Sequence, residues 1–261
     1  MSDSLKLTKR GHVFEMVLDR PKANAIDRTT SVRMGEAFCD FNADPDLWVA
    51  IVTGAGDRIF SAGWDLAAAT EGEHERMDYG PGGFAGLTEL WGLDKPVIAA
   101  VNGVAVGGGF ELMLAADLVV VSEAAEFWLP EATLGNVAEA GGIQRLSRKL
   151  PTNVAVELLM TGRRMGANEA HGRGLVNWVV PFDQVMTKAR EVADGLVASA
   201  PLSLRATKEI LRGIEGMSVR EAFEAVHSGH FPTYESMLTS EDHVEGPRAF
   251  VEKRDPKFKG R

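Results

Sequence analysis

Two glutamates in glycine-rich surroundings are the residues of this chain best suited to chemistry. Glu111 follows the three glycines 107–109, which we expect to open a helix, and Glu131 follows an apolar strand in the run Leu-Pro-Glu. Two carboxyl groups on either side of a substrate can add water reversibly to a double bond, because one takes a proton from water while the other delivers one to carbon. Each glutamate taken alone would more often be an ion-paired residue of a helix or turn. Their glycine-rich neighbours favour the catalytic interpretation.

Backbone amides beside these glutamates could hold the oxyanion that such chemistry creates. The first N–H groups of a helix that starts at 107–109 have no partner within the helix, and the helix dipole adds a partial positive charge there. In the segment 60–66, Phe-Ser-Ala-Gly-Trp-Asp-Leu, a bend at Gly63 could turn the N–H of Trp64 toward a ligand. Two donors from separate loops, Trp64 and Gly108, would form an oxyanion hole. The alternatives are tight helix–strand packing at the glycines and a simple turn at Gly63.

A third acid follows Glu131 in the same part of the chain. Glu131 lies among Trp128, Leu129 and Leu134, and such apolar neighbours raise the pKa of a carboxyl group toward the range useful for proton transfer. Glu139 stands eight residues further on, before two glycines. It could contact the substrate or take part in proton transfer.

The composition argues against several classes of partner. Acidic residues outnumber lysine and arginine by 37 to 28, which gives a net charge of −9 and disfavours nucleic acid, because phosphate binding depends on basic patches. Cys39 is the only cysteine, so no intramolecular disulfide can form and a reducing, cytoplasmic location is expected. No stretch approaches the ~18 uninterrupted apolar residues of a membrane span, and residues 1–11 lack the apolar region of a signal peptide. Membrane spanning and secretion are therefore not expected.

Short apolar strands alternate with helical patterns along the first two thirds of the chain. The predicted strands are residues 12–18, 48–53, 97–101, 118–122 and 176–180. The predicted helices are residues 27–43, 107–117, 143–150, 152–161, 167–173, 183–199 and 202–215. This alternation predicts an α/β architecture with a largely parallel sheet. No strand is expected after about residue 183, so the last third is predicted to be helical and to pack on the sheet or on a neighbouring subunit.

One irregular stretch, residues 67–90, is rich in glycine and has no clear strand pattern. Long segments of this kind inside compact domains are often functional. We expect it to form a lid near the site, and the alternative is a surface excursion with no role in binding.

Other familiar motifs are incomplete in this sequence. The run Thr-Gly-Ala-Gly at 53–56 follows a strand as a dinucleotide-binding loop would, but Ile59 stands where the third glycine belongs. No phosphate-binding P-loop and no Gly-x-Ser-x-Gly turn of a serine hydrolase is present. His227 and His230 lack the further ligands of a metal site, so no metal is expected.

The chain as a whole resembles the crotonase (enoyl-CoA hydratase/isomerase) superfamily, and the similarity runs nearly end to end. The motifs that carry it are LDRPKANAID at 18–27, FSAGWDL at 60–66, DKPVIAAVNGVAVGGGFEL at 94–112, FWLPEATLG at 127–135, GGIQRL at 141–146, TGRRMGANEAHGRGLVNWVV at 161–180 and SEDHVEGPRAFVEKRDPKFKGR at 240–261. The resemblance implies an α/β, crotonase-like ββα spiral core over residues 1–200 and a C-terminal helical trimerisation region over residues 201–261. It also implies a homo-oligomer, either a trimer or a dimer of trimers.

The resemblance further implies a site for an acyl-CoA thioester. Its carbonyl oxygen would lie between the backbone N–H groups of Trp64 and Gly108, with Glu111 and Glu131 as the catalytic acids. The implied reaction is the reversible dehydration of a 3-hydroxyacyl-CoA to a trans-2-enoyl-CoA, in which Glu131 exchanges the α-proton and Glu111 acts on the water at the β-carbon. No metal or redox cofactor is implied, because the thioester serves as the electron sink.

Further substrate contacts are implied by position within the family motifs. The residues expected along CoA are Ala23, Ala25 and Ile26 at its nucleotide end, Ala62 and Asp65 along the pantetheine and adenine, and Lys253 and Lys257 at its phosphates. An acyl group that carries a trimethylammonium cation would favour acidic and aromatic neighbours, for which Glu139, Trp128 and Trp64 are the candidates. The chain departs from many family members at Ala138 and Glu139, where they have proline and then glycine or aspartate.

Three other functions are compatible with these residues. The nearest is a short-chain enoyl-CoA hydratase, because that reaction uses the same two glutamates. An enoyl-CoA isomerase is less expected, since a single acid at the α and γ carbons would suffice. A non-catalytic CoA-binding protein would have no need of both Glu111 and Glu131.

Overall fold

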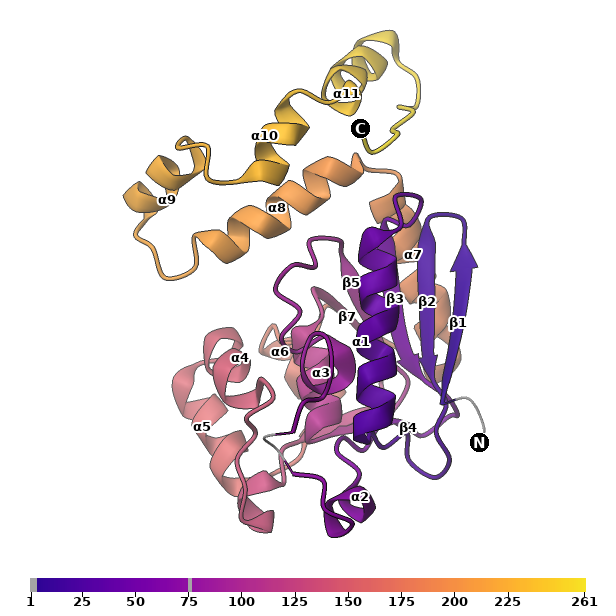
Figure 1. Ribbon diagram of the computed structural model, residues 1–261, viewed down its shortest axis with the longest axis vertical. Helices are drawn as coiled ribbons and strands as arrows, with labels where there is room; N and C mark the ends of the chain where they lie inside the picture. The colour runs from indigo at the N-terminus through magenta and orange to yellow at the C-terminus, as the bar shows by residue number, and fades with distance from the viewer. Residues whose placement is uncertain (1–3, 75–76) are drawn as a thin grey trace.

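A six-stranded sheet forms the centre of the molecule in the computed structural model, which describes residues 4–74 and 77–261. In spatial order its strands are β1 (Leu5–Arg10), β2 (Val13–Leu18), β3 (Val49–Gly54), β5 (Val97–Val101), β7 (Leu118–Ser122) and β10 (Trp178–Val180). Neighbouring strands are parallel except β1 and β2, which are antiparallel. The helix α1 (Arg28–Ala43) lies on one face of this sheet and α7 (Val185–Val197) on the other (Figure 1).

The inner strands are apolar on both faces because both faces are covered by helices. Along β3, Ala50 and Val52 belong to the cluster that contains Phe38 of α1, whereas Val49 and Ile51 belong to the cluster that contains residues of α7. This alternation is the two-residue period of a strand. It explains why the predicted strands read as continuous apolar runs and not as alternating ones.

A smaller four-stranded sheet lies beside the central one. Its strands in spatial order are β4 (Ile59–Ser61), β6 (Val104–Val106), β8 (Glu126–Trp128) and β9 (Met165–Gly166). Each of β3, β5 and β7 in the large sheet passes through a short turn into β4, β6 or β8 of the small sheet, and a helical segment follows. The chain therefore advances by one strand of each sheet with every turn of a spiral. The helical segments of this spiral are α2 (Leu66–Thr70), η1 (Phe84–Gly86), α3 (Gly108–Ala115), η2 (Glu131–Leu134), α4 (Gly142–Lys149), α5 (Thr152–Thr161), α6 (Ala167–Gly172) and η3 (Phe182–Gln184).

The turns between the two sheets depend on glycine because neighbouring turns are in close contact. A Cβ atom on Gly54 would lie 2.2 Å from the carbonyl oxygen of Phe60, and one on Gly103 would lie 2.1 Å from that of Arg58. The side-chain amide of Asn102 donates to the carbonyl oxygen of Gly56 at 2.9 Å. These contacts fix how successive turns of the spiral stack.

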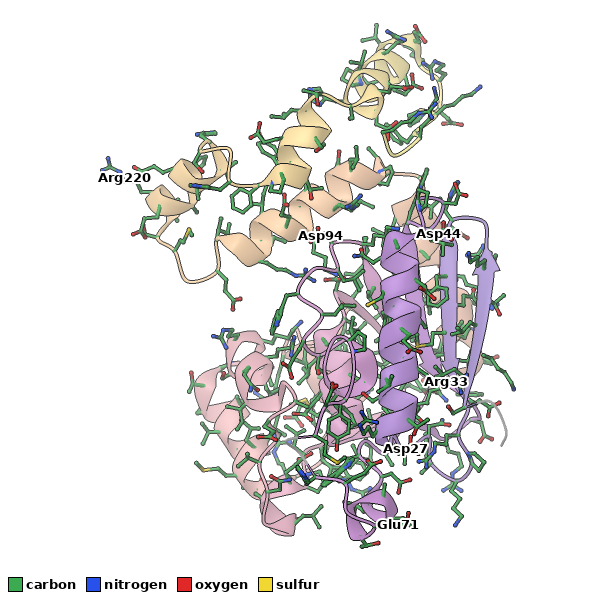
Figure 2. All side chains as sticks on the ribbon, viewed as in Figure 1. Asp27, Arg33, Asp44, Glu71, Asp94 and Arg220 are labelled. Atoms are coloured by element: carbon green, nitrogen blue, oxygen red, sulfur yellow. The ribbon has the colours of Figure 1, made fainter. Side chains whose placement is uncertain are left out.

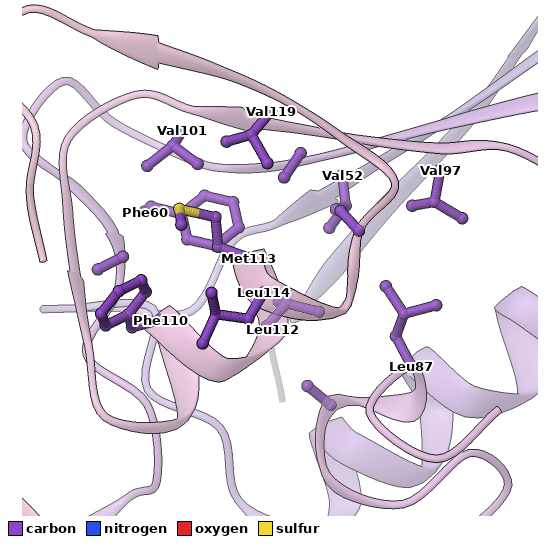
Figure 3. Close-up of a cluster of buried hydrophobic side chains, with 14 of the residues drawn as sticks. Val52, Phe60, Leu87, Val97, Val101, Phe110, Leu112, Met113, Leu114 and Val119 are labelled. Carbon is purple, nitrogen blue, oxygen red and sulfur yellow. The ribbon is translucent and has the colours of Figure 1, made fainter. Parts of the chain in front are cut away.

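The helix α3 runs through the middle of the hydrophobic core. Phe110, Leu112 and Met113 are fully buried, and Figure 3 shows them among side chains of the strands, including Val101 and Val119. A helix that is apolar on all sides is one that is buried on all sides. Any polar side chain on α3 is therefore removed from water as well.

Four helices complete the chain: α8 (Pro201–Gly213), α9 (Val219–Val226), α10 (Pro232–Leu238) and α11 (Glu241–Glu252). We call these residues 201–252 the C-terminal arm, and Figure 1 shows α9, α10 and α11 standing away from the sheets. The arm is tied to the body through α8, where the Lys208 ammonium contacts Asp117 at 2.6 Å and Arg212 lies 3.5 Å from Asp94, which faces α8 (Figure 2). Several large apolar side chains of the arm are exposed: Leu211, Met217, Val219, Phe223, Leu238, Val244, Phe250 and Val251.

The α/β architecture with a largely parallel sheet is confirmed, as are the five predicted strands and the helices up to residue 213. The sequence pattern did not reveal β1, because five of its six residues are exposed and polar residues dominate it. The short strands of the small sheet were also not predicted. In the stretch 67–90, residues 75 and 76 lie outside the described part of the chain, and the rest contains α2 and η1. Within the described residues no helix is both long and apolar enough to cross a membrane.

Candidate active site

Glu111 lies in the first turn of α3, and the burial of that helix removes it from solvent. Its side chain is 3% exposed, and its Oε1 accepts a hydrogen bond from the backbone N–H of Gly142 at 2.8 Å. Burial raises the pKa of Glu111 to about 7, and the negative charge of Glu131 adds to this, while the Gly142 N–H partly opposes it. A Cβ atom on Gly142 would lie 3.1 Å from Glu111 Oε1, so glycine is what allows this close approach.

Glu131 begins η2, directly after β8, and its carboxyl group is partly buried. The Oε2 atom is buried and has no hydrogen-bond partner within the described part of the chain. A Cβ atom on Gly107 would lie 2.6 Å from Glu131 Oε1, which places this carboxyl group against the start of α3. Burial raises the pKa of Glu131 as well. The two glutamates therefore meet at the N-terminus of α3, and each is available for proton transfer at neutral pH.

The backbone amides of Trp64 and Gly108 lie at the same place. Around Trp64, the N–H of Ile26 donates to the Gly63 carbonyl at 2.7 Å and the N–H of Asp65 donates to the Ile26 carbonyl at 3.0 Å. Alternate groups of an extended chain point to opposite sides, so the Trp64 N–H faces away from Ile26. Neither it nor the Gly108 N–H donates to an acceptor among the described residues.

The close approach of these two loops depends on Gly63. This residue has a positive φ of 78°, and a Cβ atom on it would lie 2.6 Å from the backbone nitrogen of Gly108. The Gly108 amide is also at the N-terminus of α3, where the helix dipole is positive. Two free N–H groups beside two carboxyl groups are what stabilisation of an enolate oxygen requires.

Two cavities open from this point. The first, of about 660 Å³, is lined by Glu111 and is called the Glu111 cavity; the second, of about 730 Å³, is lined by Ala62 and is called the Ala62 cavity. Five residues line both cavities and mark their junction: Trp64, Gly108, Glu131, Asn136 and Glu139. A ligand held by the two amides would therefore extend into one cavity in each direction.

The described residues that line the Glu111 cavity carry charge of one sign only. Their charged side chains are all carboxylates, and no lysine, arginine or histidine of residues 4–74 and 77–261 lines the cavity. They are Asp78, Glu89, Glu111, Glu131 and Glu139. Its aromatic side chains are Trp64, Tyr79 and Phe84. The cavity is therefore suited to a cation, or to a group that exchanges protons with carboxyls.

The residues expected along CoA lie around the loop 60–66. The backbone N–H of Ala62 donates to the Ala23 carbonyl at 3.0 Å, and the Ala25 carbonyl accepts from Arg20 at 3.0 Å. The Ile26 side chain is fully buried in the core, so only its backbone could face a ligand. The Asp65 carboxylate caps α2 and forms an ion pair with Arg20, so it is already engaged within the chain.

Three of the expected substrate contacts lie away from the cavities. The Trp128 indole lines neither cavity and has the guanidinium of Arg164 over its ring at 4.3 Å. This contradicts its expected place beside the acyl group, and the reason is strand alternation, because the neighbouring Phe127 points into the core. Lys253 ends α11 in the left-handed conformation, and the backbone N–H of Lys257 donates to Glu245 of α11 at 2.8 Å. Figure 1 shows α11 at the opposite end of the molecule from α2.

Four acidic or aromatic residues of the Glu111 cavity were not predicted individually: Asp78, Tyr79, Phe84 and Glu89. All come from the stretch 67–90, which was expected to form a lid near the site. Its described residues do line the cavity. The available signal was the mixture of acids and aromatics between the glycines of this stretch. Within the described residues, no group of three or more His, Cys, Asp or Glu is placed to hold a metal ion.

The spiral fold and the paired amides and carboxyls define an enzyme class that acts on activated acyl groups. The model of the enoyl-CoA hydratase/isomerase family matches residues 8–261, and this chain belongs to that family. It is 59% identical to the carnitinyl-CoA dehydratase of Shigella flexneri over the full length of both chains. Among solved structures it is similar to an enoyl-CoA hydratase from Mycobacterium tuberculosis, with a TM-score of 0.90, 36% identity and 99% of each chain covered. It is also similar to a carnitinyl-CoA hydratase from Mycobacterium avium, with a TM-score of 0.78, 40% identity and both chains covered completely.

Proposed function

We propose that this chain is a hydro-lyase that reversibly dehydrates a 3-hydroxyacyl-CoA to a trans-2-enoyl-CoA, with carnitinyl-CoA and crotonobetainyl-CoA as the pair of substrates. Full-length identity of 59% to a carnitinyl-CoA dehydratase supports the reaction. The observation that carries the choice of acyl group is the Glu111 cavity, which is lined by carboxylates and aromatic rings and, among the residues that the structure describes, by no cationic side chain. A trimethylammonium group is the kind of acyl substituent that such a wall favours.

The thioester lies at the junction of the two cavities in this proposal. Its carbonyl oxygen accepts hydrogen bonds from the amides of Trp64 and Gly108, its acyl part enters the Glu111 cavity, and the CoA chain leaves through the Ala62 cavity. These donors stabilise the enolate that forms when the α-proton departs, and one such donor is worth ~3–4 kcal/mol of the barrier. The thioester thereby serves as the electron sink, and the reaction uses no further cofactor.

The two glutamates divide the proton transfers between them. The Glu131 carboxylate takes the α-proton, the electron pair moves into the thioester, and the β-hydroxyl leaves as water with a proton from Glu111. A carboxyl group with a pKa of about 7, as burial gives Glu111, is about half protonated at neutral pH and can therefore serve as the acid. Hydration runs the same steps in reverse, with Glu111 taking a proton from water and Glu131 delivering one to carbon.

A short-chain enoyl-CoA hydratase with an uncharged acyl group is the second candidate. The similarity to solved enoyl-CoA hydratases favours it, because it needs the same amides and glutamates. The two candidates are separated by the hydration rates of crotonobetainyl-CoA and crotonyl-CoA, compared as kcat/KM. We expect a preference for crotonobetainyl-CoA. A large preference for crotonyl-CoA would replace the first candidate with the second.

We also propose that the C-terminal arm joins copies of this chain into a homo-oligomer, as a trimer or a dimer of trimers. Its exposed large apolar side chains, among them Phe250 at 85% exposure, support this, because large exposed apolar surface often marks a protein–protein interface. In such an assembly Lys253 and Lys257 would reach the CoA phosphates bound by a neighbouring subunit. The Ala62 cavity of the same chain is too far from them, since α2 and the arm lie at opposite ends of the molecule (Figure 1). Residues 1–200 would then form the catalytic region, and residues 201–261 would form the assembly region.

A further inference from the structure

The end of the Glu111 cavity that lies away from the thioester has its own acidic residues. Glu131 and Glu139 line both cavities and so lie at the junction, where the thioester would be held. Asp78 and Glu89 line only the Glu111 cavity. They are therefore the carboxylates that the far part of an acyl group would meet.

Glu89 is held at the cavity wall by a glycine turn. Its backbone N–H donates to the Gly82 carbonyl at 2.7 Å, and both Gly82 and Gly83 have a positive φ. A Cβ atom on Gly83 would lie 2.8 Å from Glu89 Oε1. Glycine at this position thus leaves the space that the Glu89 carboxylate occupies.

The charge of Glu89 is not neutralised by an ion pair within residues 4–74 and 77–261. Arg145 interacts electrostatically with both Glu111 and Glu89. Its guanidinium, however, donates to the Thr88 carbonyl at 2.6 Å, and it does not line the cavity. The Asp78 carboxylate is already engaged, because it accepts the Gly80 N–H at 2.8 Å. Glu89 is thus the far carboxylate with the least compensation.

Aromatic rings complete the wall of this part of the cavity. A Cβ atom on Gly108 would lie 2.4 Å from the Phe84 ring, so this ring lies directly beside the oxyanion site. Tyr79 meets Phe84 edge to face, with ring centroids 5.7 Å apart. A trimethylammonium group has no N–H to donate, so it is recognised by aromatic faces and by opposite charge.

We propose that Glu89 is the counter-ion that selects a cationic acyl group, with Phe84 and Tyr79 as the apolar wall around it. This inference rests on the proposed function, because it takes the thioester to lie between Trp64 and Gly108. The carbon that bears the ammonium group is bonded directly to the β-carbon on which Glu111 acts. Glu111 and Glu89 line the same cavity, and both interact with Arg145. When Glu111 acts on the β-carbon, the ammonium group of the substrate therefore lies on the Glu89 side of this cavity.

The test compares two thioesters of the same shape and different charge. One is crotonobetainyl-CoA, and the other is its neutral isostere, in which a tert-butyl group replaces the trimethylammonium group. The ratio of their hydration kcat/KM values is measured for the wild type, Glu89→Gln and Glu89→Asp. Two opposite charges a few ångströms apart near a protein surface attract each other appreciably. We therefore expect Glu89→Gln to lower the ratio of the two kcat/KM values about tenfold. Glu89→Asp keeps the charge and should retain most of the preference.

A matched control removes a charge elsewhere. Glu123 is exposed and lies outside both cavities, so Glu123→Gln changes the net charge equally and should leave the ratio within about twofold of the wild-type value. Thermal unfolding of each variant confirms that it is folded.

The possible results separate the inference from the function on which it rests. A wild-type preference for the cation that persists in Glu89→Gln would overturn the role of Glu89 and leave the proposed function intact. Equal falls in kcat/KM for both thioesters in Glu89→Gln would also overturn the role of Glu89, because they would show a structural effect that does not depend on the charge of the substrate. If the wild type shows no preference for the cation at all, the proposed acyl group is wrong, and the inference fails with it. A fall in the ratio that is specific to Glu89→Gln supports both.

Discussion

The spiral body and the C-terminal arm use apolar side chains in opposite ways. In the body, the residues of β3 and β5 are fully buried, and both faces of the sheet are covered by helices of the same chain. In the arm, Val219 is 76% exposed and Phe250 is 85% exposed. The central sheet of the body is therefore covered within one chain, whereas the arm leaves large apolar side chains for another molecule to cover. Exposed apolar side chains also occur on the body, among them Trp91 and Met160.

This difference separates two parts of the proposed function. The two amides and the two glutamates all come from the body, so the chemistry at the thioester is assembled within one chain. The expected phosphate contacts, Lys253 and Lys257, lie next to α11, which stands at the opposite end of the molecule from α2 (Figure 1). Substitutions in the body should therefore change kcat with assembly intact, and substitutions in the arm should change assembly first.

The largest expected effect is on the chemistry of the body. Glu131→Gln removes the group that exchanges the α-proton and should lower kcat by about 10²–10⁴-fold. The matched control is Glu126→Gln, because Glu126 lies on β8 and pairs with Arg164 at the surface. Steady-state hydration of an enoyl-CoA measures both, and circular dichroism verifies the fold. Near-normal turnover of Glu131→Gln would remove Glu131 from the mechanism.

The next effect concerns the oxyanion hole. Gly63→Ala would place a methyl group 2.6 Å from the Gly108 nitrogen and should lower kcat by about 10²–10³-fold, the cost of one lost donor. Gly56→Ala is the control for backbone strain, since Gly56 also has a positive φ and a Cβ atom there would meet nothing within 4 Å. Both variants should lose about 1–2 kcal/mol of stability from the left-handed backbone. Gly63→Ala should lose more than Gly56→Ala, because its methyl group also meets backbone atoms. If they also lost activity equally, strain and not amide blockage would be the cause.

A third prediction addresses the arm. Phe250→Glu places a charge on its exposed apolar surface and should weaken self-association by about tenfold or more, as for a central interface residue. Leu7→Glu serves as the control, because Leu7 is half-exposed on β1, which lies far from α11 (Figure 1). Sedimentation velocity over a range of protein concentrations measures the self-association of Phe250→Glu and of Leu7→Glu. An unchanged assembly in Phe250→Glu, or equal dissociation in both, would contradict the role of the arm.

The fourth prediction concerns stability and comes from the raised pKa of Glu111. The folded state holds this proton more tightly than the unfolded chain, so stability falls as pH rises from about 4.5 to about 7. Glu111→Gln removes that penalty and should stabilise the protein by up to about 3 kcal/mol at pH 8, with little difference at pH 4. Urea unfolding at the two pH values measures this. A variant that is less stable at pH 8 would show that Glu111 is not a strained, buried acid.

Local patterns in the sequence were enough to place Glu111 and the Gly108 amide at a helix start. The glycines before Glu111 and around Gly63 are local signals, because each marks a position where backbone must approach backbone. The inner strands were recognisable because both of their faces are buried. Strands of two or three residues, such as β4 and β9, carry too few side chains to show a period.

The walls of the cavities depend on contacts between distant segments. Glu89 and Tyr79 reach the site because residues 77–89 fold back toward α3, which no periodicity reveals. Trp128 was misplaced because an apolar run does not show which of its residues faces the core, and Phe127 takes that position. The sequence likewise does not predict what contacts the arm, because no described segment of the chain covers the exposed apolar residues of the arm.

The most direct measurement is a crystal structure of this protein with the saturated trimethylammonium thioester of CoA, which has neither the double bond nor the hydroxyl needed to react. We predict that its thioester oxygen lies within hydrogen-bonding distance of the backbone nitrogens of Trp64 and Gly108. Glu131 should then face the α-carbon and Glu111 the β-carbon. A thioester bound elsewhere, or carboxyl groups turned away from those carbons, would contradict the account.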